Sequence, residues 1–145
     1  SAATLSPEPP AQPIGRLSGL RVVCIDNEPA VLQGMQALLS GWGCSVITAH
    51  GSDDALEQLR KGIQPPDIIL ADYHLDDGTG TGAIAALRAA SREQIPAIII
   101  TADHSAEVLR EVRLKGHALL RKPLKAAALR ALMHQLTLRR AVAAE

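Results

Sequence analysis

Five short apolar runs, each followed by a segment with helical spacing, limit the fold of this chain more than any other feature. The runs cover residues 20–25, 44–49, 67–71, 96–100 and 118–120. The third and fourth runs show no polar alternation, which is typical of strands buried on both faces of a sheet. Strands that alternate regularly with helices predict a parallel sheet covered by helices on both sides. Right-handed crossovers then favour the strand order 2-1-3-4-5 in an α/β, doubly wound sheet.

The segments between the runs predict the helices. We expect helices from Pro29 onward and over residues 52–61, 83–88, 105–115 and 125–139. Pro29 suits the first turn of a helix. Ser52 is expected to cap the second helix, since a serine side chain at this place accepts a hydrogen bond from a backbone N–H.

The length of 145 residues is enough for one domain with a substantial core. We assign residues 19–141 to this domain and residues 1–18 to a linker or tail. The tail contains Pro7, Pro9, Pro10 and Pro13. A proline-rich spacer indicates a further upstream segment, with a plain disordered terminus as the alternative. Cys24 and Cys44 lie in apolar runs, which favours buried thiols in a reducing compartment over a disulfide.

Composition disfavours several classes of function. An aromatic fraction of 1% leaves few rings for stacking nucleic-acid bases, and a net charge of zero gives no general attraction to nucleic acids or membranes. Most of the fifteen basic residues lie from Arg110 onward, which predicts a basic face that docks a partner in preference to DNA. We expect a soluble, cytoplasmic domain without membrane contact, because no long apolar segment or signal peptide is seen.

The ends of the predicted strands carry the candidate chemistry. They present Asp26, Asn27, Asp72, Thr101 and Lys122. Strands one, three, four and five lie side by side in the expected order, so these groups should meet in one crevice. A carboxylate can attack phosphorus and form an aspartyl phosphate. The other carboxylate can hold Mg²⁺, and the hydroxyl and ammonium can bind phosphoryl oxygens.

Over residues of about 20–140, the chain also resembles the receiver domain of two-component response regulators. The matching segments are residues 22–29, 67–72, 98–102 and 121–123, with Gly80. The resemblance implies a (βα)5 flavodoxin-like receiver fold in which Asp72 is the phosphoacceptor, Thr101 the switch hydroxyl and Lys122 the phosphate partner. It also implies a cis Lys122–Pro123 bond.

For the metal, the resemblance implies Mg²⁺ bound by Asp26, Asn27, Asp72 and the backbone carbonyl of His74. Receivers usually carry two acids after the first strand, and Asn27 takes the place of the second. The loss of one charge should weaken the metal site without abolishing it.

Two further departures concern the signal and the loop after the phosphoacceptor. Leu119 stands where receivers usually have an aromatic switch residue, and Leu75-Asp76 replaces the frequent Met-Pro. We therefore expect phosphorylation to act mainly through residues 101–105 and the helix that follows them.

The stretch from Asp26 to Pro29 and the residues around Asp72 resemble the C-terminal receiver of hybrid sensor histidine kinases. This implies a bacterial phosphorelay in which a histidine kinase or histidine phosphotransfer protein is the phosphodonor and no nucleic acid is bound directly. A stand-alone response regulator and a non-phosphorylated pseudo-receiver stay open. The sequence also leaves open a weak homodimer and a membrane-associated parent chain. It does not decide whether the domain is an enzyme.

Two rival classes fit the residues less well. A haloacid-dehalogenase-type phosphatase needs a second acid where this chain has His74. A flavodoxin-like nucleotide binder needs a phosphate loop rich in glycine or hydroxyl groups after the first strand, where this chain has Asp26 to Pro29. The five histidines show no metal-ligand spacing.

Overall fold

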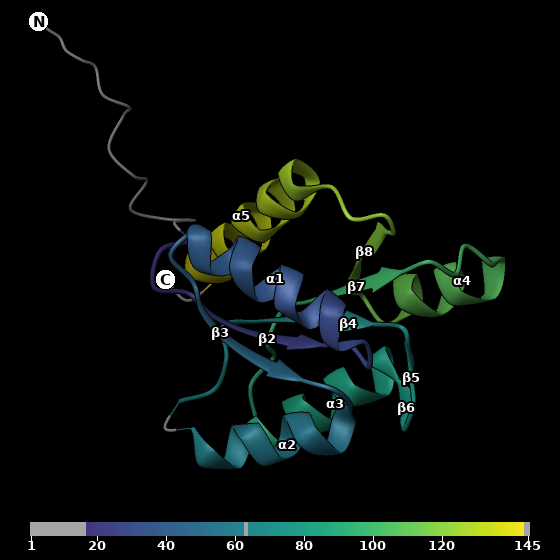
Figure 1. The fold of residues 1–145 in the computed structure, drawn as a ribbon, viewed down its shortest axis with the longest axis horizontal. Coiled ribbons are helices and arrows are strands. Elements are labelled where there is room, and N and C mark those ends of the chain that lie inside the picture. The colour runs from purple at the N-terminus through teal and green to yellow at the C-terminus, as the bar shows by residue number, and fades with distance from the viewer. Residues whose placement is uncertain (1–16, 63, 144–145) are drawn as a thin grey trace, which may run out of the picture.

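The five apolar runs form one parallel sheet in the computed structural model, which describes residues 17–62 and 64–143 (Figure 1). Its strands are β2 (Arg21–Ile25), β3 (Ser45–Ala49), β4 (Ile68–Asp72), β7 (Ala97–Thr101) and β8 (Ala118–Arg121). Their order across the sheet is β3-β2-β4-β7-β8, and every neighbouring pair is parallel. Counted along the chain, this is the order 2-1-3-4-5, so the predicted α/β fold class and topology are confirmed.

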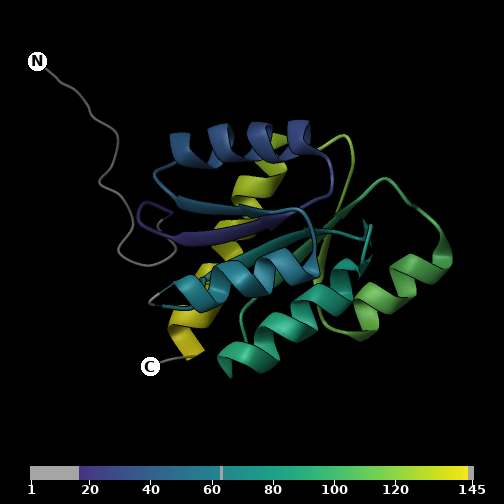
Figure 2. The same cartoon turned by 60° about the horizontal axis from the view of Figure 1, so that its bottom comes forward.

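Helices cover both faces of the sheet. They are α1 (Pro29–Gly41), α2 (Ser52–Lys61), α3 (Gly80–Ser91), α4 (Ala106–Leu114) and α5 (Ala126–Ala143). Figures 1 and 2 show α1 on the opposite side of the sheet from α2 and α3. The α3 helix begins three residues earlier than predicted, because Thr79 caps its first turn by accepting from the backbone N–H of Gly82.

Two separate apolar cores result from this layering. Side chains of β2 alternate between them: Val22 and Cys24 pack with α1 and α5, whereas Val23 and Ile25 pack with α2, α3 and α4. The same alternation along β4 explains why its residues 68–71 are all apolar. Both cysteines are buried and free, as predicted.

The start of α2 corrects one prediction. Gly51, not Ser52, occupies the cap position, and no side chain at that position supplies a capping bond. Instead, the carboxylate of Asp77 accepts from the backbone N–H groups of Ser52 at 3.1 Å and Asp53 at 3.2 Å. Asp77 lies between two short strands that the sequence did not predict, β5 (His74–Leu75) and β6 (Gly78–Thr79). Strands of two residues are too short to show a periodic pattern.

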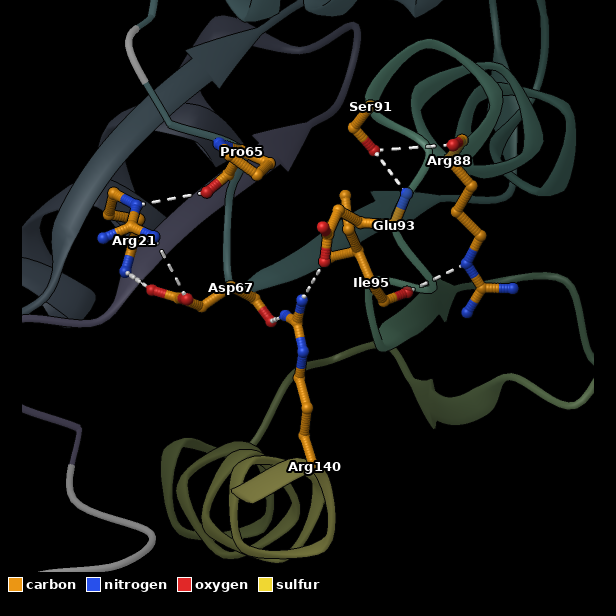
Figure 3. A network of polar contacts seen from close by, with 8 residues as sticks. All are labelled: Arg21, Pro65, Asp67, Arg88, Ser91, Glu93, Ile95 and Arg140. Atoms are coloured by element: carbon orange, nitrogen blue, oxygen red, sulfur yellow. Dashed lines mark hydrogen bonds and ion pairs between the residues drawn. The ribbon is translucent and has the colours of Figure 1, made fainter. Parts of the chain in front are cut away.

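Where β2 and β4 begin, a network of polar contacts holds the C-terminal part of α5 (Figure 3). The guanidinium of Arg140 donates to the carbonyl oxygen of Asp67 at 3.0 Å and to Oε1 of Glu93 at 3.1 Å. Arg21 donates to the carbonyl oxygen of Pro65 at 3.1 Å and pairs with the Asp67 carboxylate at 3.4 Å. The last helix is therefore tied to the segment that enters the central strand.

Most of the predicted tail lies outside the described residues. Leu17, which is described, is 3% exposed and packs in the core beneath α1 and α5, two positions before the predicted start of the domain. The boundaries at 19 and 141 stay predictions. Within the described part of the chain, no helix has the length and apolar character needed to cross a membrane.

Candidate functional site

Polar side chains from three strands meet at the carboxyl edge of the sheet. Asp26 follows β2, Asp72 ends β4, and Lys122 follows β8. The Lys122 ammonium lies 3.2 Å from Oδ2 of Asp26 and 3.6 Å from Oδ2 of Asp72. The side chains of Asp26 and Asp72 are 6% and 15% exposed, so this cluster of two acids and one cation is shielded from bulk water. The structure thus brings together three of the residues that the strand-end pattern selected.

A small cavity lies beneath this cluster. Its volume is about 40 Å³, and Asp26, Asp72 and Lys122 line it together with apolar side chains such as Met35 and Ile100. A space of this size can hold only a few water molecules. The site therefore consists of a polar rim on an apolar floor, which strengthens electrostatic interactions at the rim.

Burial sets the proton affinity of the central carboxylate. Burial raises the pKa of Asp72 above its ordinary value, the Lys122 charge opposes this, and the charge of Asp26 adds to it. For Lys122, burial lowers the pKa, but the hydrogen bond to Asp26 and the charges of Asp72 and Asp26 outweigh burial, so its pKa is raised. Lys122 is therefore a stable cation between two acids.

The backbone around Asp72 explains why a glycine stands at position 80. A β-carbon on Gly80 would lie 2.2 Å from the carbonyl oxygen of Asp72, which is far closer than atoms can pack. The backbone N–H of Gly80 also donates to the carbonyl oxygen of Tyr73 at 2.7 Å. The start of α3 is thus pressed against the end of β4, and this contact fixes the backbone that carries Asp72.

The remaining predicted residues take different positions. Thr101 ends β7, is 1% exposed, and its hydroxyl accepts from the backbone N–H of Asp103 at 2.9 Å. Asn27 lines a neighbouring open groove with Asp53, Asp76 and Asp77, not the cavity beneath Asp72. Its part in metal binding stays a prediction.

The loop after Asp72 also places the side chain of His74. The imidazole of His74 pairs with a residue of the loop after β7, where Nε2 lies 2.7 Å from Oδ2 of Asp103. The proposed metal ligand at this position is the backbone carbonyl of His74, and that role stays a prediction too. The Lys122–Pro123 peptide bond is cis, as predicted.

Sequence reasoning missed a second polar group beside the site. Glu111 of α4 accepts hydrogen bonds from the hydroxyls of Tyr73 and Thr81. Tyr73 directly follows Asp72 and is the chain's single tyrosine, which was the one available signal. Thr81 and Glu111 are 30 positions apart and share no local pattern.

The donor set fits a hard cation with oxygen ligands. No cluster of three or more acidic, histidine or cysteine side chains able to hold a metal occurs within residues 17–62 and 64–143. Two nearby carboxylates do occur, in Asp26 and Asp72. Mg²⁺ is commonly bound by one or two carboxylates, with water and phosphate oxygens completing its shell. Asp26 is well placed for this, because its Oδ1 accepts from the backbone N–H of Glu28 at 2.9 Å and is held in a fixed orientation.

Comparison with known proteins agrees with this geometry. The response regulator receiver domain family matches residues 22–134, so the chain belongs to the receiver domains of two-component response regulators. Receiver domains take phosphoryl groups from histidine kinases and generally bind Mg²⁺ at the acidic pocket.

Among similar proteins of known sequence, the transcriptional regulatory protein ZraR of Salmonella typhimurium strain LT2 is 34% identical over 105 residues, which cover 71% of this chain and 23% of ZraR. The sensor protein GacS of Pseudomonas syringae pv. syringae is 31% identical over 100 residues, which cover 66% of this chain and 11% of GacS. This chain therefore spans only a small part of either relative.

Solved structures confirm the fold. A response regulator receiver domain protein from Clostridium thermocellum superposes with a TM-score of 0.76 at 22% identity, covering 85% of this chain and 98% of the other. The chemotaxis protein CheY4 of Vibrio cholerae superposes with a TM-score of 0.72 at 23% identity, covering 82% and 99% of the two chains.

Proposed function

We propose that this domain accepts a phosphoryl group on Asp72 from a phosphohistidine of a histidine kinase or histidine phosphotransfer protein. The observation that carries the proposal is the position of the Lys122 ammonium, 3.6 Å from the Asp72 carboxylate and 3.2 Å from Asp26. An acid nucleophile beside a fixed cation and a second acid is the arrangement that phosphoryl transfer to a carboxylate requires.

In this reaction, Oδ of Asp72 attacks phosphorus, the new O–P bond forms, and the P–N bond to the donor imidazole breaks. The electron pair of that bond stays with the imidazole nitrogen, which then takes up a proton. Lys122 pairs with phosphoryl oxygens and balances the charge that moves onto Asp72. The hydroxyl of Thr101 can donate a hydrogen bond to another phosphoryl oxygen, because its present contact with Asp103 uses it only as an acceptor.

Mg²⁺ supplies charge neutralisation for the phosphoryl oxygens when it is bound. Asp26 and Asp72 would hold it, with Asn27 and the backbone carbonyl of His74 as further donors. Asn27 contributes a neutral oxygen where a second carboxylate would contribute a charge. The cation affinity is therefore expected to be reduced.

We further propose that the domain is the C-terminal receiver of a hybrid sensor histidine kinase acting in a phosphorelay. The stretch from Asp26 to Pro29 supports this context, and one similar protein is a sensor protein. Other similar proteins are transcriptional regulatory proteins, which support a response regulator as the alternative. Asn27 is the one observation that favours a pseudo-receiver. A cytoplasmic location and a weak homodimer stay predictions.

Incubation with acetyl phosphate and Mg²⁺, followed by intact-mass measurement, tests the phosphoacceptor. Wild type should gain one phosphoryl group, and chelation of the cation should prevent the gain. Asp72→Asn should gain none, whereas Asp76→Asn, a change at an exposed acid in the next loop, should be labelled like wild type. Equal labelling of Asp72→Asn would rule out the assignment, and unlabelled wild type would favour the pseudo-receiver.

A further inference from the structure

A single carboxylate joins helix α4 to the residue beside the phosphoacceptor. Oε1 of Glu111 accepts a hydrogen bond from the hydroxyl of Tyr73, and Oε2 accepts from the hydroxyl of Thr81 at 2.6 Å. Tyr73 directly follows Asp72, and Thr81 lies in the first turn of α3. Glu111 therefore connects three elements: α4, α3 and the end of β4.

These hydrogen bonds are charge-assisted near neutral pH. The hydroxyl of Thr81, followed by that of Tyr73, lowers the pKa of Glu111, so the carboxylate is ionised. The hydrogen bond to Glu111, together with burial, raises the pKa of Tyr73 to about 12, so the phenol keeps its proton and donates. Hydrogen bonds to an ionised acceptor are stronger than neutral ones. Thr81 is 1% exposed, which shields its bond from water.

Apart from this polar group, α4 has a narrow attachment to the domain. Val108 and Val112 are its two buried side chains, and Leu114 at its end is 79% exposed. Figure 1 shows α4 at the periphery of the fold, beside β7 and β8. The hydrogen bonds that Glu111 accepts are therefore a substantial part of what holds the helix in place.

We propose that Glu111 couples the position of α4 to the state of Asp72, with its bonds to Tyr73 and Thr81 made only in the unphosphorylated arrangement. This coupling rests on the phosphoacceptor function proposed above. It supplies a connection to α4 in a chain where Leu119 offers no aromatic ring. Glu111 and Tyr73 are positioning residues, because they touch neither the phosphoryl group nor the attacking oxygen.

Hydrogen bonds between Thr101, Asp103 and Ser105 connect the surroundings of Asp72 to the start of α4. The Thr101 hydroxyl accepts a hydrogen bond from the backbone N–H of Asp103 at 2.9 Å. Asp103 in turn accepts from the N–H of Ser105, the residue that caps α4. In the proposed coupling, a shift of the Thr101 hydroxyl toward a phosphoryl oxygen on Asp72 displaces the start of α4 through these contacts. The backbone of Tyr73 is held separately, because the N–H of Gly80 donates to its carbonyl oxygen at 2.7 Å.

A contact made in one of two states favours that state, and its removal favours the other. The measurement is the dissociation constant of beryllium fluoride with Mg²⁺, in which beryllium fluoride replaces the phosphoryl group on Asp72. We expect Tyr73→Phe and Glu111→Gln each to tighten binding about fivefold or more, the lower range of typical couplings. The double variant should bind no more tightly than the tighter single one, because the hydrogen bond that Tyr73→Phe removes is one of the two that Glu111→Gln weakens. Glu107→Gln, a change at an exposed acid one turn earlier in α4, is the matched control and should bind like wild type.

Amide hydrogen exchange over residues 106–114 gives a second measurement. Tyr73→Phe with Mg²⁺ alone should already exchange about as fast here as wild type does with beryllium fluoride. A role in stability alone would weaken beryllium fluoride binding, which is the opposite direction. Unchanged or weaker binding by both variants, with normal binding by wild type, would overturn the coupling and leave the phosphoacceptor intact. Failure of wild type to bind would contradict the phosphoacceptor, and the coupling with it.

Discussion

The ammonium of Lys122 donates a hydrogen bond to Oδ2 of Asp26 at 3.2 Å, although 96 positions separate the two residues in the chain. The same acid is the expected ligand of Mg²⁺. Lysine and the cation therefore compete for one carboxylate, and the charge of Lys122 opposes any second positive charge at the site.

The first prediction concerns this competition. Lys122→Met should raise the affinity for Mg²⁺ about tenfold or more. Two unit charges 4 Å apart interact by about 4 kcal/mol at an effective dielectric constant of 20 before solvation offsets it, and about 1.4 kcal/mol is one decade. Labelling by acetyl phosphate should slow about 100-fold, the typical cost of losing one group that stabilises transition-state charge. Titration calorimetry checks the affinity, and weaker Mg²⁺ binding would contradict the proposed competition.

Asn27→Asp tests the missing acid. A second carboxylate beside Asp26 should tighten Mg²⁺ binding about tenfold, because ligand charge tunes cation affinity. Asp76→Asn, at an acid lining the same groove as Asn27, controls for general changes in surface charge. An unchanged dissociation constant in Asn27→Asp would mean that residue 27 does not contact the cation.

Stability against pH should reveal the buried acid. Because the folded-state pKa of Asp72 is raised, ionisation of Asp72 disfavours the fold. This loss of stability is fully present above the pKa of Asp72 in the folded state. It disappears as the pH falls to the pKa of Asp72 in the unfolded chain. Asp72→Asn should therefore raise the melting temperature at pH 7, with a smaller gain at pH 4.

Replacement of Asp103 should change the melting temperature in the opposite direction. The hydrogen bond with His74 and the N–H of Ser105 lower the pKa of Asp103 to about 2, so its ionisation favours the fold. Asp103→Asn should therefore lower the melting temperature at pH 7, with a smaller loss as pH falls toward 2. Melting curves between pH 2 and 8 compare the two variants, and equal shifts of one sign would refute the electrostatic explanation.

A pair of glycine substitutions tests the contact beneath Asp72. Gly80→Ala should destabilise the domain by about 1–3 kcal/mol or more, because the new carbon would overlap the Asp72 carbonyl oxygen. Gly34→Ala, on the exposed side of α1 with no atom within 4 Å, should stabilise it by about 0.5–1 kcal/mol through better helix propensity. Urea unfolding measures both, and equal effects would contradict the close approach.

The cap of α2 gives a prediction in which sequence and structure differ. Asp77→Ala should cost about 1 kcal/mol, since Asp77 accepts from the first two N–H groups of the helix. Ser52→Ala should cost less than about 0.5 kcal/mol, as surface changes usually do. If urea unfolding showed a larger loss of stability for Ser52→Ala than for Asp77→Ala, Ser52 would be the cap.

The sequence was sufficient wherever a rule links spacing to position. Periodicity located the strands and helices, and the strand-end rule then predicted that Asp26, Asp72 and Lys122 would meet, although the chain between them folds into four helices. Local propensity failed at Ser52, because Asp77 supplied the cap from a loop 25 positions away. A cap of this kind depends on how two loops pack together, so the sequence of either segment alone does not predict it.

The hydrogen bonds of Glu111 could not be predicted for the same reason, because they join segments that are distant in the sequence. Glutamate on a helix surface is common, and nothing near Glu111 in sequence indicates that a tyrosine 38 positions earlier will reach it. Asn27 shows a further limit of prediction from sequence. Its residue type predicted a weaker metal site, but the backbone after β2 determines whether residue 27 lines the cavity beneath Asp72 or the neighbouring groove.

The burial of both cysteines makes the native chain convenient for selective chemical labelling. Burial raises the pKa of the Cys24 thiol to about 12 and also raises that of Cys44, so neither forms the nucleophilic thiolate readily. The chain has no third cysteine. A cysteine introduced at Leu114, which is 79% exposed, would therefore be the one reactive thiol, and a fluorophore or spin label could report on α4 without any change to the native cysteines.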